Sequence, residues 1–281
     1  MLWTPGGRSP NLEDRRSVGG GGGGMGRGLG IGGTVVVLAL SLLFGRNLFS
    51  DLGVQPAVGA TANAPFSAAD SAAQETEVQF ISFVLDDVQS TWAKTLPNYG
   101  ASFHPAKLVL FRNSISSGCG EAQSVMGPFY CPTDERVYLD LGFFDELKQK
   151  FGASGDFAQA YVLAHELGHH VQHLLGTDAQ VRRLQEQHPD QANQLSVRLE
   201  LQADCYAGVW AHSTDTRGRL QQGDIDEALN AASSVGDDRI QQQETGRINV
   251  DSFTHGSAAQ RSASFKKGFA SGDPRSCDIS S

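Results

Sequence analysis

The chain has 281 residues, of which 40% are hydrophobic, and a formal net charge of −9. That length accommodates one domain of about 200 residues together with accessory segments. The acidic balance, without a basic patch interleaved with aromatic residues, excludes the usual nucleic-acid-binding classes, so we expect no nucleic-acid partner.

The N-terminal part contains an uncharged, largely apolar run. Residues 28–45 lie between Arg27 and Arg46 and contain no charged side chain. At about 1.5 Å per residue, a helix of this length spans roughly 27 Å, enough to cross the hydrocarbon core of a membrane. We therefore predict a disordered glycine-rich N-terminus, a transmembrane helix and a flexible linker, over residues 1–27, 28–46 and 47–74.

Arginines are distributed unequally around this run. Arg8, Arg15, Arg16 and Arg27 precede it, and Arg46 follows it closely. Because positively charged flanks stay in the cytoplasm, we predict a cytoplasmic N-terminus and a main domain on the outer side of the membrane. A cleaved signal peptide is the alternative, although no small-x-small cleavage site closes the run.

From residue 75 onward the apolar residues recur mainly at helical spacing. Val78, Ile81, Leu85, Val88 and Trp92 fall at intervals of three and four residues, which predicts a first amphipathic helix. Later patterns predict, in chain order, strands 107–112 and 136–141 and helices 143–151, 156–176, 178–188, 191–212, 224–233 and 256–270. The expected fold class is α+β, a mainly helical domain over residues 75–281 with a small β-sheet.

The predicted helix over residues 156–176 contains an H-E-x-x-H pattern, His165-Glu166-Leu167-Gly168-His169. On a helix, side chains four residues apart share a face, so His165 and His169 can reach the same metal ion. Glu166 is rotated by about 100° from His165, where it can take a proton from the attacking water. The pattern is typical of a catalytic zinc site. The alternative is a buried helix whose histidines only pack or form hydrogen bonds.

A catalytic zinc site usually has a third protein ligand. The extended motif with a third histidine on the same helix does not occur, because its glycine and histidine positions hold Gln172 and Leu175. Glu200 and Asp204 lie four residues apart on the next long helix, so their side chains share a face. We interpret Glu200 as the third ligand and Asp204 as a supporting carboxylate that accepts the outer N–H of a ligand histidine. The alternative is an acidic face in contact with solvent.

Four cysteines, Cys119, Cys131, Cys205 and Cys277, all follow the predicted membrane segment, and none forms a Cys-x-x-Cys motif. An even number in an exported domain predicts two disulfides, with three possible connectivities. Cys119–Cys131 closes a short loop and is the natural local pair. Cys205–Cys277 would then tie the C-terminal tail to the helix that carries Glu200. Reduced, buried thiols are the alternative.

The segments His165–Gln172 and Glu200–Asp204 together resemble the zinc-binding motifs of gluzincin metallopeptidases. Three further segments, Asn11–Arg16, Gly127–Cys131 and Phe253–Arg261, resemble the bacterial family of membrane-anchored neutral zinc metallopeptidases. The resemblance covers nearly the whole chain. It implies a reaction type, zinc-dependent peptide hydrolysis, and little else. The single ligand set predicts one Zn²⁺ per chain. The apolar run and its arginines predict a single-pass protein of the bacterial inner membrane whose zincin-like domain faces the periplasm or the cell exterior.

The same resemblance suggests a donor for the oxyanion that forms during peptide hydrolysis. By analogy of role with other gluzincins, His255 is the first candidate and Tyr206 the second. A capping or surface role for His255 is an equally good interpretation. Near the motif, His170 faces away from the expected metal, and His173 is a weaker rival ligand because no glutamate follows His169.

Together these features predict a membrane-anchored zinc metallopeptidase that hydrolyses a peptide or protein substrate. His165, His169 and Glu200 would hold the zinc, and Glu166 would act as the general base. The rival is a non-catalytic, zinc-stabilised envelope scaffold. The intact Glu166 counts against that rival, because a structural site needs no base and favours four closed protein ligands.

Overall fold

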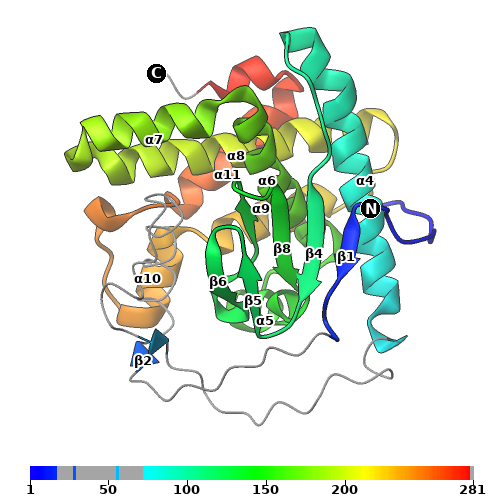
Figure 1. Cartoon of the computed structure of the whole chain (residues 1–281), viewed down its shortest axis with the longest axis horizontal. Helices are drawn as coiled ribbons and strands as arrows, with labels where there is room; N and C mark the ends of the chain where they lie inside the picture. Colours follow the sequence, from blue (N-terminus) through cyan, green and yellow to red (C-terminus); the bar gives the residue numbers. More distant parts are fainter. Residues whose placement is uncertain (18–27, 30–54, 57–71, 279–281) are drawn as a thin grey trace.

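The computed structural model describes residues 1–17, 28–29, 55–56 and 72–278. In this part of the chain, helices lie behind and beside a β-sheet (Figure 1). Its strands are, in order, β1 (Leu12–Asp14), β4 (Lys107–Phe111), β8 (Arg136–Asp140) and β7 (Phe129–Cys131). The expected α+β class, mainly helical with a small sheet, is therefore confirmed.

The helices follow the predicted pattern closely. They are α4 (Glu75–Thr95), α5 (Gly142–Phe151), α6 (Asp156–Leu175), α7 (Thr177–Gln187), α8 (Ala192–Thr216), α9 (Asp224–Ser234), α10 (Asp237–Thr245) and α11 (Ala258–Ser271). α6 ends where Gly176 adopts a φ of 73°, a conformation that favours glycine. Helix α10 escaped prediction because Ile240 is the single aliphatic residue in its sequence, which leaves no apolar period.

The strands were predicted less completely. β4 (Lys107–Phe111) and β8 (Arg136–Asp140) match the two predicted strands and pair in parallel. β7 (Phe129–Cys131) pairs antiparallel with β8 and ends the sheet. Two small pairs complete the strands: β5 (Ser114–Ser117) with β6 (Gly120–Gln123), and β2 (Gly28–Leu29) with β3 (Gln55–Pro56). Strands of two to four residues are too short to show an alternating pattern.

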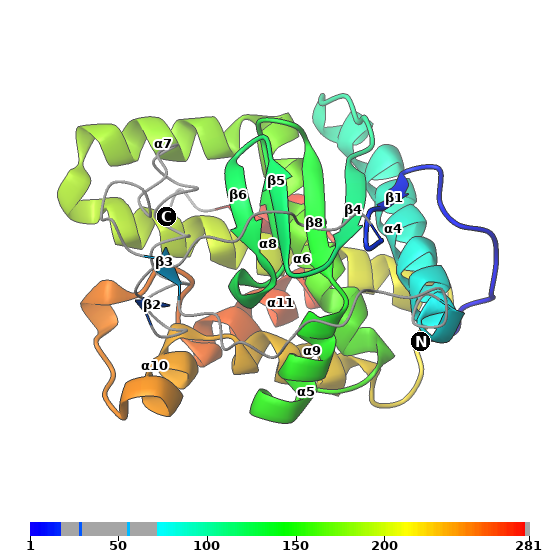
Figure 2. The same ribbon diagram turned by 60° about the horizontal axis from the view of Figure 1, so that its bottom comes forward.

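The two faces of the sheet pack against different partners. Leu108 and Leu110 of β4 belong to the main core, shared with the helices. Val109 and Phe111 point to the opposite face, which packs against the β5–β6 hairpin. Figure 2 shows this hairpin on the outer side of the sheet, with α6 and α8 behind it. The sheet thus supports one side of α6, the helix that carries the predicted zinc ligands.

Residues 1–17 are part of this domain. β1 (Leu12–Asp14) pairs in parallel with β4. Met1 is 3% exposed, and its ammonium group lies 2.8 Å from a carboxylate oxygen of Asp156 and 3.2 Å from one of Asp224. The predicted disorder over residues 1–27 is therefore wrong for the first 17 residues. The glycine run dominated that interpretation, whereas the residues before it supply an edge strand.

The pairing of β1 with β4 also constrains membrane topology. A single crossing between residues 17 and 72 would place β1 and β4 on opposite sides of the membrane, where they could not pair. The predicted topology, with a cytoplasmic N-terminus and the main domain outside, would require β1 to leave β4, and it stays a prediction. The predicted transmembrane helix lies outside the described residues, apart from its first two. Among the residues that are described, no helix is sufficiently long and apolar to span a bilayer.

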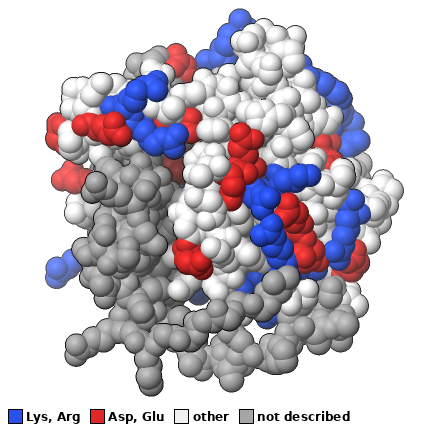
Figure 3. Space-filling model, viewed as in Figure 1, with Lys and Arg blue, Asp and Glu red and all other residues white. Residues whose placement is uncertain are grey.

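Charged side chains of both signs are mixed on the face seen in Figure 3. Near β1 and β8, for example, Glu13 lies 2.5 Å from Arg15 and 3.5 Å from Arg136. The expectation that nucleic acid is not a partner stays a prediction.

Candidate metal centre

Two helices that contact each other closely carry the predicted metal ligands. Gly168 of α6 lies against α8: a Cβ at this position would be 3.1 Å from the carbonyl oxygen of Ala203. A larger residue here would push the helices apart. This close approach brings the turn of α8 between Glu200 and Asp204 next to the histidines of α6.

The structure brings together the three predicted ligands. Nε2 of His165 lies 3.2 Å from one carboxylate oxygen of Glu200, and Nε2 of His169 lies 3.5 Å from the other. Ligand atoms of all three residues lie within 4.8 Å of one another. Burial alone would raise the pKa of Glu200, but the neighbouring histidines, His169 first, hold it well below its ordinary value. Glu200 is therefore an anion facing two imidazole nitrogens.

Asp204 orients His165. Its Oδ1 lies 2.8 Å from Nδ1 of His165, and because an ionised carboxylate only accepts hydrogen bonds, Nδ1 carries the proton. Burial would lower the pKa of His165, but Asp204 and Glu200 raise it to about 10, so in the metal-free site Nε2 donates to Glu200. A bound metal would take the place of that proton. Asp204 also accepts a hydrogen bond from the hydroxyl of Tyr161. Two more come from Nε and Nη2 of Arg261, each at 2.9 Å.

Arg261 keeps Asp204 ionised in a completely buried position. Asp204 is 0% exposed and Arg261 only 4%. Burial alone would raise the pKa of Asp204, but the charges of Arg261 and His165 and their hydrogen bonds lower it to about 2. Asp204 thus contacts a ligand histidine as predicted, and Arg261 of α11 adds a cation beside it.

Gln172 orients His169. Its Oε1 lies 2.8 Å from Nδ1 of His169. Its Nε2 donates to the carbonyl oxygen of Leu199 at 2.7 Å and to Oε1 of Gln202 at 3.0 Å. Because those two partners only accept, the Gln172 amide cannot be turned around, and its oxygen must face His169. His169 therefore also carries its proton on Nδ1.

This donor set fits a zinc ion. Two neutral imidazoles and one carboxylate are a common catalytic zinc ligand set, with a further position left for water. Both outer nitrogens are held by acceptors, so both inner nitrogens point to Glu200 and would present lone pairs to a metal that displaces their protons. Glu166, 8% exposed, is not among the ligands, and its charge interacts with His169. It lies beside the ligand set, as the helical spacing predicted.

His255 lies near Glu200. The turn that carries it contacts α8: a Cβ on Gly256 would be 3.2 Å from Val197, three residues before Glu200, and 3.4 Å from Leu201, the residue after it. Nδ1 of His255 lies 3.2 Å from Oδ1 of Asp237, the first residue of α10. Burial would lower the pKa of His255, but this hydrogen bond and the charges of Glu200 and Asp237 raise it.

Tyr206, the second oxyanion candidate, lies elsewhere. It is 3% exposed and makes an edge-to-face contact with Trp92 in the main core. Burial raises its pKa. The ring of Tyr206 packs in the core, whereas His255 lies near Glu200, so His255 stays the first candidate.

The other histidines of α6 have structural partners. His170 is bonded through both ring nitrogens, to the hydroxyl of Tyr130 at 2.9 Å and to the carbonyl oxygen of His104 at 2.8 Å. His173 lies 2.9 Å from Asp178 and 3.8 Å from Glu135. The rival ligand His173 is thus engaged by two carboxylates outside the ligand set.

Both predicted disulfides are present. Cys119 is bonded to Cys131, and Cys205 to Cys277. The first joins the β5–β6 turn to β7. The second joins the C-terminal tail to α8, one residue after Asp204.

A second acidic cluster contains Asp156, Asp224 and Glu227. The ammonium group of Met1 lies between the two aspartates, and Oε2 of Glu227 accepts a hydrogen bond from the backbone of Phe157 at 3.0 Å. These partners satisfy the cluster without a metal.

Four supporting residues were missed from the sequence: Tyr161, Gln172, Asp237 and Arg261. Tyr161 and Gln172 do lie four residues before His165 and three after His169, on the ligand face of α6. That spacing was an available signal. Asp237 and Arg261 come from other helices, and only the tertiary structure brings them near.

Comparisons with known proteins agree with this geometry. A family model described as "Putative neutral zinc metallopeptidase" matches residues 1–280. "Uncharacterized protein YpfJ" of Escherichia coli is 46% identical over 286 residues, 99% of this chain and 98% of the relative. "Uncharacterized protein Mb2605" of Mycobacterium bovis is 47% identical over 204 residues, 69% of this chain and 67% of the relative. No solved structure matches. The chain therefore belongs to the neutral zinc metallopeptidase family.

Proposed function

We propose that this protein is a zinc-dependent peptidase whose metal is held by His165, His169 and Glu200. The observation that carries the proposal is the convergence of two oriented imidazole nitrogens on one buried carboxylate, with Glu166 beside them. A zinc ion bound there would supply a Lewis acid for the scissile carbonyl and would lower the pKa of a coordinated water.

The residues of the chain divide the remaining work. Glu166 accepts the proton of the attacking water and delivers it to the leaving nitrogen. His255 donates from Nε2 to the oxyanion, because its Nδ1–H is engaged by Asp237 and its raised pKa favours the doubly protonated ring. His255 is thus assigned through its place near Glu200 and its protonation.

The substrate is a peptide in extended conformation, bound along β7. This strand ends the sheet, and the hydroxyl of Tyr130 in β7 contacts His170 of the zinc helix. Backbone groups of a terminal strand can pair with an added peptide strand. A peptide on β7 would run beside the helix that carries His165 and His169.

The domain acts in an oxidising compartment and is associated with a membrane. Two disulfides support export, because such bonds persist mainly outside the cytoplasm. Since β1 pairs with β4, residues 1–17 are exported with the domain. Membrane attachment through residues 28–46 remains part of the proposal on the basis of the sequence alone.

The test is unbiased cleavage-site profiling with the full-length protein. Mass spectrometry would identify new peptide termini produced by the wild type, Glu166→Gln and a matched control, Glu146→Gln, which changes an exposed glutamate of α5. Wild type and control should produce the same termini, and Glu166→Gln should produce almost none while retaining zinc. Equal cleavage by Glu166→Gln would exclude this mechanism. Zinc binding without cleavage by any of the three would favour the scaffold.

A further inference from the structure

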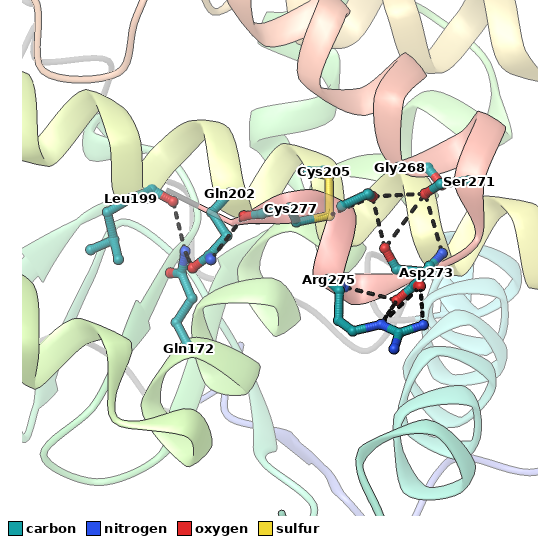
Figure 4. The surroundings of a disulfide bond; sticks show 10 residues. Gln172, Leu199, Gln202, Cys205, Gly268, Ser271, Asp273, Arg275 and Cys277 are labelled. Atoms are coloured by element: carbon teal, nitrogen blue, oxygen red, sulfur yellow. Dashed lines mark hydrogen bonds and ion pairs between the residues drawn. A yellow bond between two sulfur atoms is a disulfide. The ribbon is translucent and has the colours of Figure 1, made fainter. Parts of the chain in front are cut away.

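A line of buried amides connects the C-terminal tail to the metal ligand His169. The carbonyl oxygen of Cys277 accepts a hydrogen bond from Nε2 of Gln202 at 3.0 Å. Oε1 of Gln202 accepts from Nε2 of Gln172 at 3.0 Å, and Oε1 of Gln172 faces Nδ1 of His169 at 2.8 Å. Figure 4 shows the links from Gln172 to Cys277, with the disulfide beside them.

We propose that Gln172 and Gln202 are positioning residues for His169, and that the Cys205–Cys277 disulfide fixes the far end of this line. The proposal rests on the metal site of the proposed function. It makes the zinc affinity depend on a disulfide that has no direct contact with a ligand.

Each link has a defined direction. The Cys277 carbonyl can only accept, so it draws the amide nitrogen of Gln202 toward itself and turns the oxygen of Gln202 toward Gln172. That oxygen and the Leu199 carbonyl take both N–H donors of Gln172. The oxygen of Gln172 is left for His169. Reversing either amide would place donor against donor and acceptor against acceptor.

Burial makes these directions energetically important. Gln172 is 0% exposed and Gln202 is 6% exposed, so water cannot easily replace a lost partner. A buried amide without its partner costs about 1–3 kcal/mol. The line therefore favours one rotamer of each amide and one orientation of His169, with Nδ1–H toward Gln172 and Nε2 toward the metal position.

The disulfide holds the last acceptor in place. Gln202 and Cys205 lie three residues apart on α8 and share a face. The bond from Cys205 to Cys277 therefore pins the tail directly over Gln202. Both cysteines are buried, at 2% and 3% exposure. Without the bond, the short 3-10 turn Pro274–Cys277 would lose its covalent attachment to α8.

The test compares zinc dissociation constants, measured by competition with a chromophoric chelator, and the visible spectrum of the cobalt(II)-substituted full-length protein. Gln172→Leu should weaken zinc binding about 10–100-fold, as loss of a partner of a ligand histidine does. Gln202→Leu and the double variant Cys205→Ser/Cys277→Ser should weaken it less, up to about tenfold, because Leu199 still holds Gln172. All three should alter the cobalt spectrum.

Matched controls separate positioning from general stability. Gln185→Leu removes another buried glutamine, 3% exposed, whose Nε2 donates to the Ala192 carbonyl and to Ser196. Cys119→Ser/Cys131→Ser removes the other disulfide. Both controls should lower the midpoint of thermal unfolding of the metal-free protein while leaving the zinc dissociation constant and cobalt spectrum unchanged.

The possible failures are distinct. A wild type that binds no zinc would contradict the metal site and the proposed function. A wild type that binds zinc no more tightly than Gln172→Leu would contradict the positioning line alone. If Gln172→Leu does not fold, Gln202→Leu decides the same point. Unchanged zinc affinity in the serine double variant would remove the disulfide from the proposal.

Discussion

Replacing Arg261 by methionine tests how the completely buried Asp204 is tolerated. The arginine donates twice to Asp204 at 2.9 Å, and both residues are almost or completely inaccessible to water. Arg261→Met leaves an apolar chain of similar length beside a buried carboxylate that keeps only His165 and Tyr161 as partners. Breaking a buried ion pair in this way costs about 3–5 kcal/mol. For a domain of this size, that loss corresponds to a fall of roughly 6–20 °C in the unfolding midpoint.

The assay is thermal and urea unfolding of the metal-free protein with both disulfides intact. A second variant, Arg261→Met/Asp204→Asn, removes the charge that the arginine compensates. It should lose less stability than the sum of the two single variants, because a neutral amide at position 204 has no need of the cation. A change below about 1 kcal/mol in Arg261→Met, a size usual for exposed ion pairs, would refute the buried-pair interpretation.

Three further outcomes are expected. Gly268→Ala should lower the free energy of unfolding, measured in urea, by at least about 1–3 kcal/mol. Its Cβ would lie 1.9 Å from the carbonyl oxygen of Cys205 and force α11 away from α8. An unchanged urea midpoint would contradict this helix contact. The lowered pKa of Asp204 stabilises the fold above its ordinary value of 3.8, so roughly 2 kcal/mol should be lost as the pH falls from about 4 to about 2. The double variant Arg261→Met/Asp204→Asn should lack that part of the pH dependence, and equal slopes would exclude Asp204 as its source. Finally, Leu2→Cys and Val250→Cys place thiols at positions that are 53% and 69% exposed. In intact cells both should react to the same extent with a membrane-impermeant maleimide. Labelling of only one would contradict the pairing of β1 with β4 on one side of the membrane.

The candidate zinc ligands could be predicted from the sequence because their spacing is local. His165 and His169 lie one helical turn apart, and Glu200 and Asp204 repeat that spacing on α8. What spacing cannot give is the meeting of the two helices. That depends on Gly168, whose missing side chain lets α8 approach. The sequence shows both Gly168 and Ala203, but it does not show that they are in contact.

The supporting contacts were harder to anticipate. Arg261 reaches Asp204 from a helix 57 residues away, and the tail reaches Gln202 from 75 residues away. No local period encodes such contacts. The N-terminal strand was not predicted for another reason. β1 has only three residues, and the glycine run after it gave a stronger signal of disorder. Pairing with β4, far along the chain, is what orders it.

Anomalous X-ray scattering at the zinc edge, from crystals of the purified full-length protein, tests the metal site most directly. We expect one strong peak per chain, about 2.0–2.2 Å from Nε2 of His165, Nε2 of His169 and a carboxylate oxygen of Glu200. A zinc-free protein, or a peak at Asp156, Asp224 and Glu227 instead, would contradict the assignment of this centre.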